Sequence, residues 1–247
     1  KTVTIPRAVT KGEHIRRRGE DIHKGEIAVA KGTAVTPALV GFLTSLGIYE
    51  IPIYAPPRIT ILPTGSELIR DHLGWKEGKI FESNSFCLAA ALQSLSLKPV
   101  IFPPIADVEK YLTTAIADGL AKCDFLIISG GVSVGERDLV RGILERLGVK
   151  EIFWGVAQKP GKPLFFGERR GKFVFGLPGN PASSLVCFYE YIRPALLKWL
   201  GFPDWRPESI MARLAGPVHK EDSRTHFLRG LARKKNGEWR VKIFSGQ

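Results

Sequence analysis

The sequence lacks three features that would each point to a particular class of protein. No apolar run approaches the roughly 18 residues that a membrane-spanning helix needs. Residues 1–20 are strongly basic and contain no apolar segment, so we expect no secretory signal. The three cysteines, Cys87, Cys123 and Cys187, form no Cys-x-x-Cys pair and have no histidine cluster beside them. This usage favours the reduced cytoplasm over a disulfide framework.

The charge is unbalanced, with 36 lysines and arginines against 24 acidic residues and a net charge of +12. Such a charge can serve a nucleic acid or an anionic small substrate. No helix-turn-helix, zinc-finger or RNA-recognition pattern is present. The only dense basic cluster, His14–Arg18, is followed at once by Gly19, Glu20 and Asp21. We therefore expect an anionic small substrate, with no nucleic-acid partner and no membrane partner.

The sequence is expected to form three parts, because 247 residues suffice for one large or several small domains. Residues 1–56 carry regularly spaced glycines and are predicted to be the remnant of a β-rich region with a linker. A helix is predicted from Thr36-Pro37 to Leu46, and a strand over Ile48–Tyr54. Residues 206–247 are predicted to be a partial β domain. The first residue is not Met, so we expect a fragment of a longer protein.

Residues 57–205 alternate strands and helices, as in a doubly wound α/β domain. The predicted strands are Arg58–Leu62, Val100–Phe102, Phe125–Ile128 and a hairpin of Leu164–Phe166 with Phe173–Gly176, turning at Arg169–Gly171. The predicted helices begin at Ser83 or Asn84, at Asp107, after Asp138 and near Ala182, the last one kinked or divided by Pro194.

The stretch Cys123–Asp138 is the centre of this domain. Its apolar run is typical of a strand buried on both faces of a parallel sheet. Ser129, Gly130 and Gly131 then begin a loop, where glycines let backbone N–H groups approach an anion. Asp138 can cap the next helix or hold a cation. Taken alone, a Gly-Gly pair after a strand also fits an ordinary tight turn.

Four loops carry unusual chemistry: Thr64–Glu67, Ser129–Asp138, Lys159–Pro163 and Gly176–Ser183. In Lys159–Pro163 two lysines stand three apart between prolines, which suits an oxyanion or phosphate clamp or a solvated turn. In Gly176–Ser183 a hydroxyl and backbone donors lie at a helix start, which also suits a plain N-cap. Carboxylates at loop-to-helix junctions near these lysines resemble a Mg²⁺-dependent phosphate site, or they are helix caps.

The motifs RRRGEDI, TGSEL, ESN, SGGVSVGERD, KPGKP and GLPGNPASS occur in this order over nearly the whole chain. In this the sequence resembles the MoeA-type molybdopterin molybdenumtransferases and the gephyrin E domain. The resemblance implies an α/β fold with a MogA-like doubly wound central domain and small β-rich flanking segments. It implies that adenylylated molybdopterin is hydrolysed, molybdate is inserted at the dithiolene and AMP leaves. Mg²⁺ is the expected cofactor, and the expected partners are a second copy of the chain and a MogA-type adenylyltransferase.

The resemblance also implies roles for individual residues, carried over motif by motif. The expected catalytic residues are Asp21, Glu67, Asp107, Asp138, Lys159 and Lys162, with Asp107 and Asp138 as metal ligands. The expected substrate-binding residues are Thr64, Gly65, Ser129, Gly130, Gly131, Ser133, Gly135, Pro163, Gly179, Asn180 and Ser183. Arg224 and Arg229 both resemble arginines of the family's last domain, and the choice of a molybdate contact between them stays open.

The sequence departs from the family pattern at acidic positions. Ser66 stands where an acid is usual, Val108 follows Asp107 where a second Asp is usual, and Glu82 replaces a common Asp. Arg137 lies beside a proposed metal ligand. These changes lower the local negative charge and are expected to weaken or shift metal binding. The family's N-terminal catalytic segment and the serine-bearing end of its last domain are also missing.

Two other functions are weighed against molybdate insertion. A molybdopterin adenylyltransferase of the same fold would need an ATP-binding pattern around the glycine loop, and KPGKP fits insertion better. A non-catalytic scaffold module is the third reading, because the gephyrin E domain also anchors partners. The intact lysine pair and carboxylates argue against a purely structural role.

Overall fold

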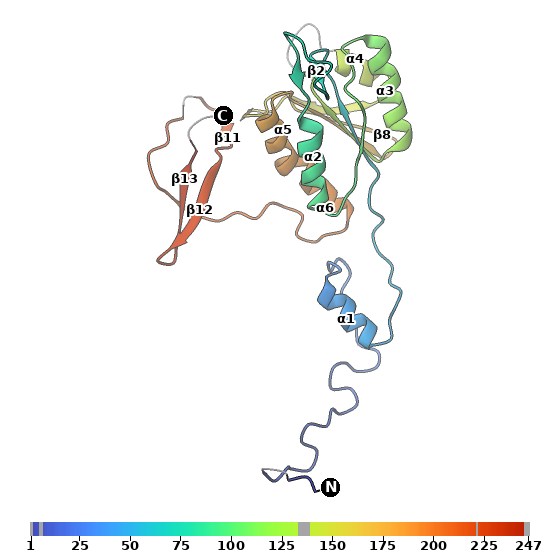
Figure 1. The fold of residues 1–247 in the computed structure, drawn as a ribbon, viewed down its shortest axis with the longest axis vertical. Helices are drawn as coiled ribbons and strands as arrows, with labels where there is room; N and C mark the ends of the chain where they lie inside the picture. The colour runs from blue at the N-terminus through green and yellow to red at the C-terminus, as the bar shows by residue number, and fades with distance from the viewer. Residues whose placement is uncertain (1, 5–6, 133–138, 221, 245–247) are drawn as a thin grey trace. The chain divides into compact units, whose positions relative to one another are not determined.

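The computed structural model describes residues 2–4, 7–132, 139–220 and 222–244. Their contacts divide them into two units, one within residues 1–53 and one within residues 54–247, whose helices and strands are labelled in Figure 1. Within these described ranges, no helix is both long and apolar enough to span a bilayer. The boundaries proposed above at residues 56/57 and 205/206 stay a prediction.

The first unit contains one helix, α1 (Pro37–Ser45), among its described residues. The side chain of Thr36 accepts a hydrogen bond from the N–H of Leu39 at 3.2 Å, and Pro37 occupies the first helical turn, as predicted. The strand predicted over Ile48–Tyr54 is wrong, since these residues have no regular structure.

The prediction that residues 1–56 are β-rich is also wrong for the described residues. The backbone here makes local turns, such as the bonds from Glu13 N to Thr10 O and from Glu20 N to Arg17 O. Gly12 and Gly19 have positive φ values of 90° and 83°, which reverse the chain instead of extending it. An extended segment needs a hydrogen-bonded neighbour to persist in water. The described part of this unit offers none, so short apolar stretches stay irregular.

The second unit is built on a six-stranded sheet. In order across the sheet, the strands are β4 (Val100–Ile101), β1 (Ile59–Pro63), β5 (Phe125–Ser129), β9 (Lys172–Leu177), β8 (Phe165–Arg169) and β6 (Lys150–Trp154). The first four run parallel, whereas β8 and β6 each pair antiparallel with their neighbour. This arrangement confirms the α/β class and the predicted hairpin that turns at Arg169–Gly171.

Helices cover both faces of this sheet. On one face, α2 (Asn84–Gln93), α5 (Pro181–Cys187) and α6 (Arg193–Trp199) pack against side chains such as Ile61 and Phe125. On the other face, α3 (Glu109–Lys122) and α4 (Leu139–Arg146) pack against Leu62 and Leu126. Neighbouring residues of β1 and β5 thus point to opposite cores, which explains their unbroken apolar runs. Each fully buried side chain of this kind contributes roughly 1.5–3 kcal/mol.

The long helix after β9 is interrupted, as its proline predicts. A π-helix, η1 (Phe188–Ile192), joins α5 to α6, and Pro194 follows directly in the first turn of α6. Proline has no N–H for the carbonyl four residues earlier, so the regular α-helical ladder cannot run through this point. In the turn before Pro194 the backbone hydrogen bonds therefore span five residues instead of four, as in a π-helix.

The predicted start of one helix is wrong and that of another is confirmed. Helix α3 begins at Glu109 with Val108 at the N-cap position, so Asp107 lies one residue too early to cap it, and its Oδ2 accepts a hydrogen bond from Ser66 N at 3.1 Å. Helix α2 begins at Asn84 with Ser83 at the N-cap position, as predicted, although the side chain of Ser83 makes no cap bond. There the carboxylate of Glu82 accepts from the N–H of Ser85 at 2.7 Å.

Shorter strands complete the second unit. Leu68–Ile69 (β2) pairs with Ile80–Phe81 (β3). The C-terminal residues form a three-stranded sheet of β10 (Arg213–Leu214), β13 (Glu238–Ile243) and β12 (Gly230–Lys235). Strand β11 (Thr225–His226), which lies between β10 and β12 in sequence, pairs in parallel with β7 (Gln158–Lys159).

All three cysteines are free. Burial raises the pKa of the Cys123 thiol to about 11 and that of Cys187 to about 12. Both therefore stay protonated at neutral pH and act as small buried apolar groups.

Candidate functional site

The carboxyl ends of three parallel strands meet at one edge of the sheet. After β1, the N–H of Thr64 donates to Ser129 O at 2.8 Å, and after β5 the N–H of Gly130 donates to Leu177 O at 3.0 Å. In open α/β sheets, ligands bind outside the carboxyl ends of the strands. The loops that begin at Thr64, Ser129 and Leu177 are therefore the structural candidates for a binding site.

Asn84, at the start of α2, ties two of these loops together. Its Nδ2 donates to Ser129 Oγ and to Gly179 O, both at 2.8 Å. Asn84 Oδ1 and Thr64 Oγ1 are buried and have no hydrogen-bond partner among the described residues. A buried polar atom without a partner costs free energy. Two such atoms at this edge fit a place where a polar ligand or water completes the hydrogen bonding.

The glycines after β5 are required by space as well as by conformation. Gly130 has φ +94°, and a Cβ there would lie 2.4 Å from the carbonyl oxygen of Thr64. Gly131 has φ +67°, and its Cβ would lie 2.8 Å from Thr64 Oγ1 and 2.7 Å from Val140 Cγ2. No side chain fits at either position, so the backbone itself faces this part of the edge. The predicted site residues Ser133, Gly135 and Asp138 lie outside the described residues.

The loop after β1 is fixed by a reciprocal pair. Ser66 N donates to Asp107 Oδ2 at 3.1 Å, and Asp107 N donates to Ser66 Oγ at 2.9 Å. A carboxylate at position 66 would face that of Asp107, so serine suits this contact better than the usual acid. The Glu67 carboxylate lies over Gly65, where a Cβ would meet Glu67 Oε1 at 2.7 Å. Glu67 and Asp107 are thus carried on two loops joined at Ser66.

The Glu82 carboxylate is buried in an ion pair. Glu82 is 6% exposed, accepts from Arg70 Nη2 at 3.2 Å and from the Ser85 hydroxyl at 2.5 Å. Arg70 also donates to Phe102 O at 2.7 Å. The pair joins the loop that carries β2 and β3 to the start of α2. The Glu82 side chain therefore stabilises the structure around Asn84 rather than facing the loops at the edge.

The start of α5 is a capped helix end. Asn180 Oδ1 accepts from Ser183 N at 3.1 Å, and Pro181 follows it. The cap reading offered for this loop is thus confirmed for Asn180, while Ser183 is buried at 8% exposure. In the lysine loop, residues 159–163, Lys159 and Pro163 are half-buried and Lys162 is exposed.

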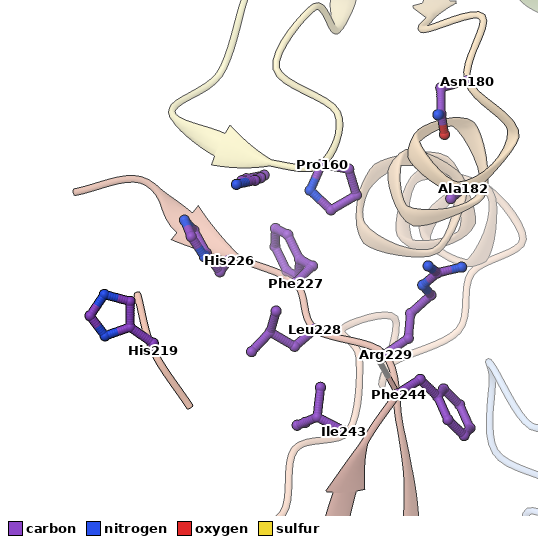
Figure 2. A pocket seen from close by; sticks show the side chains of 11 residues that line it. Pro160, Asn180, Ala182, His219, His226, Phe227, Leu228, Arg229, Ile243 and Phe244 are labelled. Atoms are coloured by element: carbon purple, nitrogen blue, oxygen red, sulfur yellow. The ribbon is translucent and has the colours of Figure 1, made fainter. Parts of the chain in front are cut away.

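A pocket of about 260 Å³ lies between the lysine loop, the start of α5 and the C-terminal strands (Figure 2). Its lining residues are Lys159, Pro160, Asn180, Ala182, His219, His226, Phe227, Leu228, Arg229, Ile243 and Phe244. One part is basic and the other is apolar. Such a pocket suits an anionic group attached to a flat or apolar body.

Arg224 and Arg229, the two candidate molybdate contacts, lie at different positions relative to the pocket. Arg229 lines the pocket with Lys159, whereas Arg224 is outside its lining and donates from Nε to Asp222 Oδ2 at 3.0 Å. Asp222 also lies 2.8 Å from Nε2 of His226. Hydrogen bonds from Arg224 and then from His226 hold the pKa of the Asp222 carboxyl well below its usual range. Asp222 is thus an ionised anchor that orients His226 in the pocket wall.

Sequence reasoning missed Asn84 and His226 as site residues. The sequence places Asn84 at a helix start, and its polar contacts reach 45 and 95 residues along the chain. The run from Arg224 to Arg229 does not alternate polar and apolar residues, so no local pattern identifies His226. Its place in the pocket wall follows from the pairing of β11 with β7.

The described residues include no group of three or more His, Cys, Asp or Glu side chains that could hold a metal ion. Mg²⁺ needs only one or two carboxylates together with phosphate oxygens. Asp107 fits such a role with Oδ1, because Oδ2 takes the bond from Ser66. The second expected ligand, Asp138, is not described. Asp21 is exposed in the first unit, where it accepts from Arg16 Nη2 at 2.9 Å.

Two protein families match the chain. The family described as "Probable molybdopterin binding domain" matches residues 60–198. The family described as "MoeA N-terminal region (domain I and II)" matches residues 1–47.

Curated relatives and solved structures agree with these matches. A molybdopterin molybdenumtransferase of Haemophilus influenzae is 35% identical over 93% of this chain and 57% of its own length. One from Bacillus subtilis is 32% identical over 96% of this chain and 55% of its own length. The chain thus spans little more than half the length of these relatives.

A crystal structure of a molybdopterin biosynthesis MoeA protein from Pyrococcus horikosii is similar, with a TM-score of 0.77 and 29% identity. The alignment covers 92% of this chain and 55% of that one. Since the molybdopterin-binding family matches residues 60–198, more than half of the 247 residues, this chain belongs to that family, as a member of the MoeA type.

Proposed function

We propose that the chain acts in molybdenum cofactor biosynthesis as a molybdopterin molybdenumtransferase. In this reaction adenylylated molybdopterin is hydrolysed, molybdate is inserted at the dithiolene and AMP leaves. The names of the relatives support the proposal. The observation that carries it is the meeting of three strand ends, with Thr64 Oγ1 and Asn84 Oδ1 buried there and lacking a hydrogen-bond partner among the residues that the structure describes.

The residues divide into two groups by what they offer. The loops at Thr64 and Gly130 offer backbone groups and hydroxyls to the pterin and its phosphate, because glycine lets the ligand approach closely. Ser129 and Gly179, joined through Asn84, shape the same surface. The lysine loop and Ser183 are proposed to bind molybdate, since ammonium groups attract an oxyanion.

The carboxylates are proposed to act on the phosphates. Asp107 and Asp138 are the residues that would hold Mg²⁺, which when bound would neutralise the pyrophosphate charge. Asp107 offers one carboxylate oxygen for this purpose. Glu67 and Asp21 are proposed as further acids of the site.

Further partners are proposed from the resemblance. A second copy of the chain would complete the binding site in a homodimer. A MogA-type adenylyltransferase would supply the adenylylated substrate.

The purified chain is expected to release AMP from adenylylated molybdopterin in a molybdate-dependent reaction. Lys162→Ala is expected to raise the molybdate concentration at half-maximal rate about tenfold, as for the loss of one charged hydrogen bond. AMP release measured by chromatography over a molybdate series gives this value. Lys110→Ala, at an exposed lysine of α3, is the matched control and should leave the concentration unchanged.

An unaltered molybdate dependence in Lys162→Ala would remove this lysine from the molybdate site. ATP-dependent adenylylation of molybdopterin by the chain would instead favour the adenylyltransferase reading. If the chain neither binds molybdopterin nor releases AMP, even at concentrations at which two copies of the chain can associate, the proposed function is wrong.

The pocket predicts a difference between the two arginines. Arg229→Ala should raise the half-maximal molybdate concentration about tenfold, because Arg229 lines the pocket beside Lys159. Arg224→Ala should change it less, since Arg224 lies outside the lining and acts through Asp222. The same molybdate series measures both variants. A larger effect at Arg224 would reverse the assignment.

A further inference from the structure

We propose that Gln158, held by Tyr191, is a positioning residue. It fixes the lysine loop against the continuous helical segment formed by α5 and η1. The inference rests on the proposed function, in that the lysines of this loop meet an oxyanion. It adds two residues that bind no ligand themselves. They determine the positions of Lys159 and Lys162 relative to the start of α5.

The amide of Gln158 fills the inside of the loop. The residue is 2% exposed, and its Nε2 donates to Pro160 O at 3.1 Å and to Gly161 O at 3.3 Å. These two carbonyls belong to the turn between the lysines. A buried side chain that satisfies two loop carbonyls restricts the conformations of that turn.

Tyr191 sets the orientation of this amide. Its hydroxyl donates to Gln158 Oε1, so the amide oxygen meets a donor while the amide nitrogen meets the carbonyls. The reverse orientation would place Oε1 against two carbonyl oxygens and is disfavoured. Tyr191 comes from η1, and a π-helical turn inside a helix is often found where a side chain serves a functional site.

Close packing holds the middle of the loop, Gly161, in place. A Cβ on Gly161 would lie 2.6 Å from Gln158 Nε2 and 2.7 Å from Cys187 Sγ. Gly161 is therefore pressed between the amide and the last residue of α5. Beyond it, the carbonyl of Lys162 accepts from Val156 N at 2.9 Å and from Leu164 N at 3.0 Å.

The network connects the two halves of the proposed oxyanion site. Lys159 directly follows Gln158, and Lys162 directly follows Gly161, so the backbone beside each lysine is fixed. The helix against which the network packs, α5, begins at Pro181 and is capped by Asn180. Pro160, Asn180 and Ala182 line the same pocket (Figure 2). A preordered pair of cations loses less conformational entropy on binding, which raises affinity without a new contact.

The test uses Tyr191→Phe, which removes one hydroxyl and leaves the ring. Tyr189→Phe is the matched control, since Tyr189 is exposed on the same π-helix. Hydrogen–deuterium exchange of the unliganded chain should be faster at the amides of Val156 and Leu164 in Tyr191→Phe. Calorimetric titration with molybdate should show an affinity about fivefold weaker, as expected for one hydrogen bond. Tyr189→Phe should match the unaltered chain in both measurements.

A second variant, Gln158→Leu, tests the other partner. Gln158→Leu and the double variant Gln158→Leu/Tyr191→Phe should both bind molybdate more weakly than the unaltered chain, and by the same factor, because both residues act through one amide. A purely structural role would lower the unfolding midpoint and leave molybdate affinity unchanged in the folded variants, and that result would overturn the proposal. Unchanged exchange in Tyr191→Phe would also overturn it. Faster exchange in that variant, with no molybdate binding by the unaltered chain, would support the ordering role and contradict the proposed function instead.

Discussion

Gly130→Ala is expected to lower the free energy of unfolding by about 3 kcal/mol and to abolish molybdopterin binding. A left-handed backbone costs an alanine about 1 kcal/mol. At φ +94° the new Cβ would also lie 2.4 Å from the carbonyl oxygen of Thr64, and such overpacking adds about 1–3 kcal/mol. Backbone cannot rotate away as a flexible side chain can, so the strand ends of β1 and β5 must separate.

The control separates conformational strain from the clash. Gly171, in the turn of the β8–β9 hairpin, has φ +78° and nothing within 4 Å of an added Cβ. Gly171→Ala should therefore cost about 1 kcal/mol and leave ligand binding intact. Urea unfolding followed by tryptophan fluorescence measures both variants, because all five tryptophans lie in residues 54–247. Equal losses in the two variants would show that the contact with Thr64 is not tight.

Local patterns predicted the elements that depend on local physics. The run Phe125–Ile128 is buried on both faces, and its composition alone predicts a strand of that kind. Thr36 and Pro37 define a helix start through neighbours in sequence. Pro194 divides its helix because the missing N–H is a property of that residue.

Contacts between distant residues explain what the sequence could not predict. Asp107 has the residue type of a helix cap, but α3 begins one residue too late for it, and the Asp107 carboxylate accepts instead from Ser66, 41 residues earlier. Ile48–Tyr54 is apolar enough for a strand, but an extended segment also needs a neighbour to pair with. At the site, the lysine and glycine loops could be named from their motifs. The pocket could not be predicted from the sequence, because it depends on the pairing of β7 with β11. These strands have only two residues each and lie far apart in sequence.

Arg70→Met is expected to lower the free energy of unfolding by about 3 kcal/mol. The side chain of Glu82 is 1% exposed and that of Arg70 is 28% exposed, so removal of Arg70 leaves a buried carboxylate without its cation. Breaking a buried pair from one side costs about 3–5 kcal/mol, and the partial exposure of Arg70 favours the lower end. Lys122→Met is the control, since Lys122 and Asp118 are 67% and 42% exposed and such a pair contributes at most about 1 kcal/mol.

The double variant Arg70→Met/Glu82→Gln decides whether the unpaired charge is the cause. Glutamine keeps the size of Glu82 and can still accept from Ser85, but it carries no charge to bury. The double variant should therefore be more stable than Arg70→Met alone, a non-additive result measured by the same urea titrations. If it is less stable, the loss in Arg70→Met comes from the bond to Phe102 and the packing on Phe86 rather than from Glu82. Since Glu82 holds the start of α2, a change at this pair should also alter the position of Asn84, and with it the two hydrogen bonds from Asn84 to Ser129 and to Gly179.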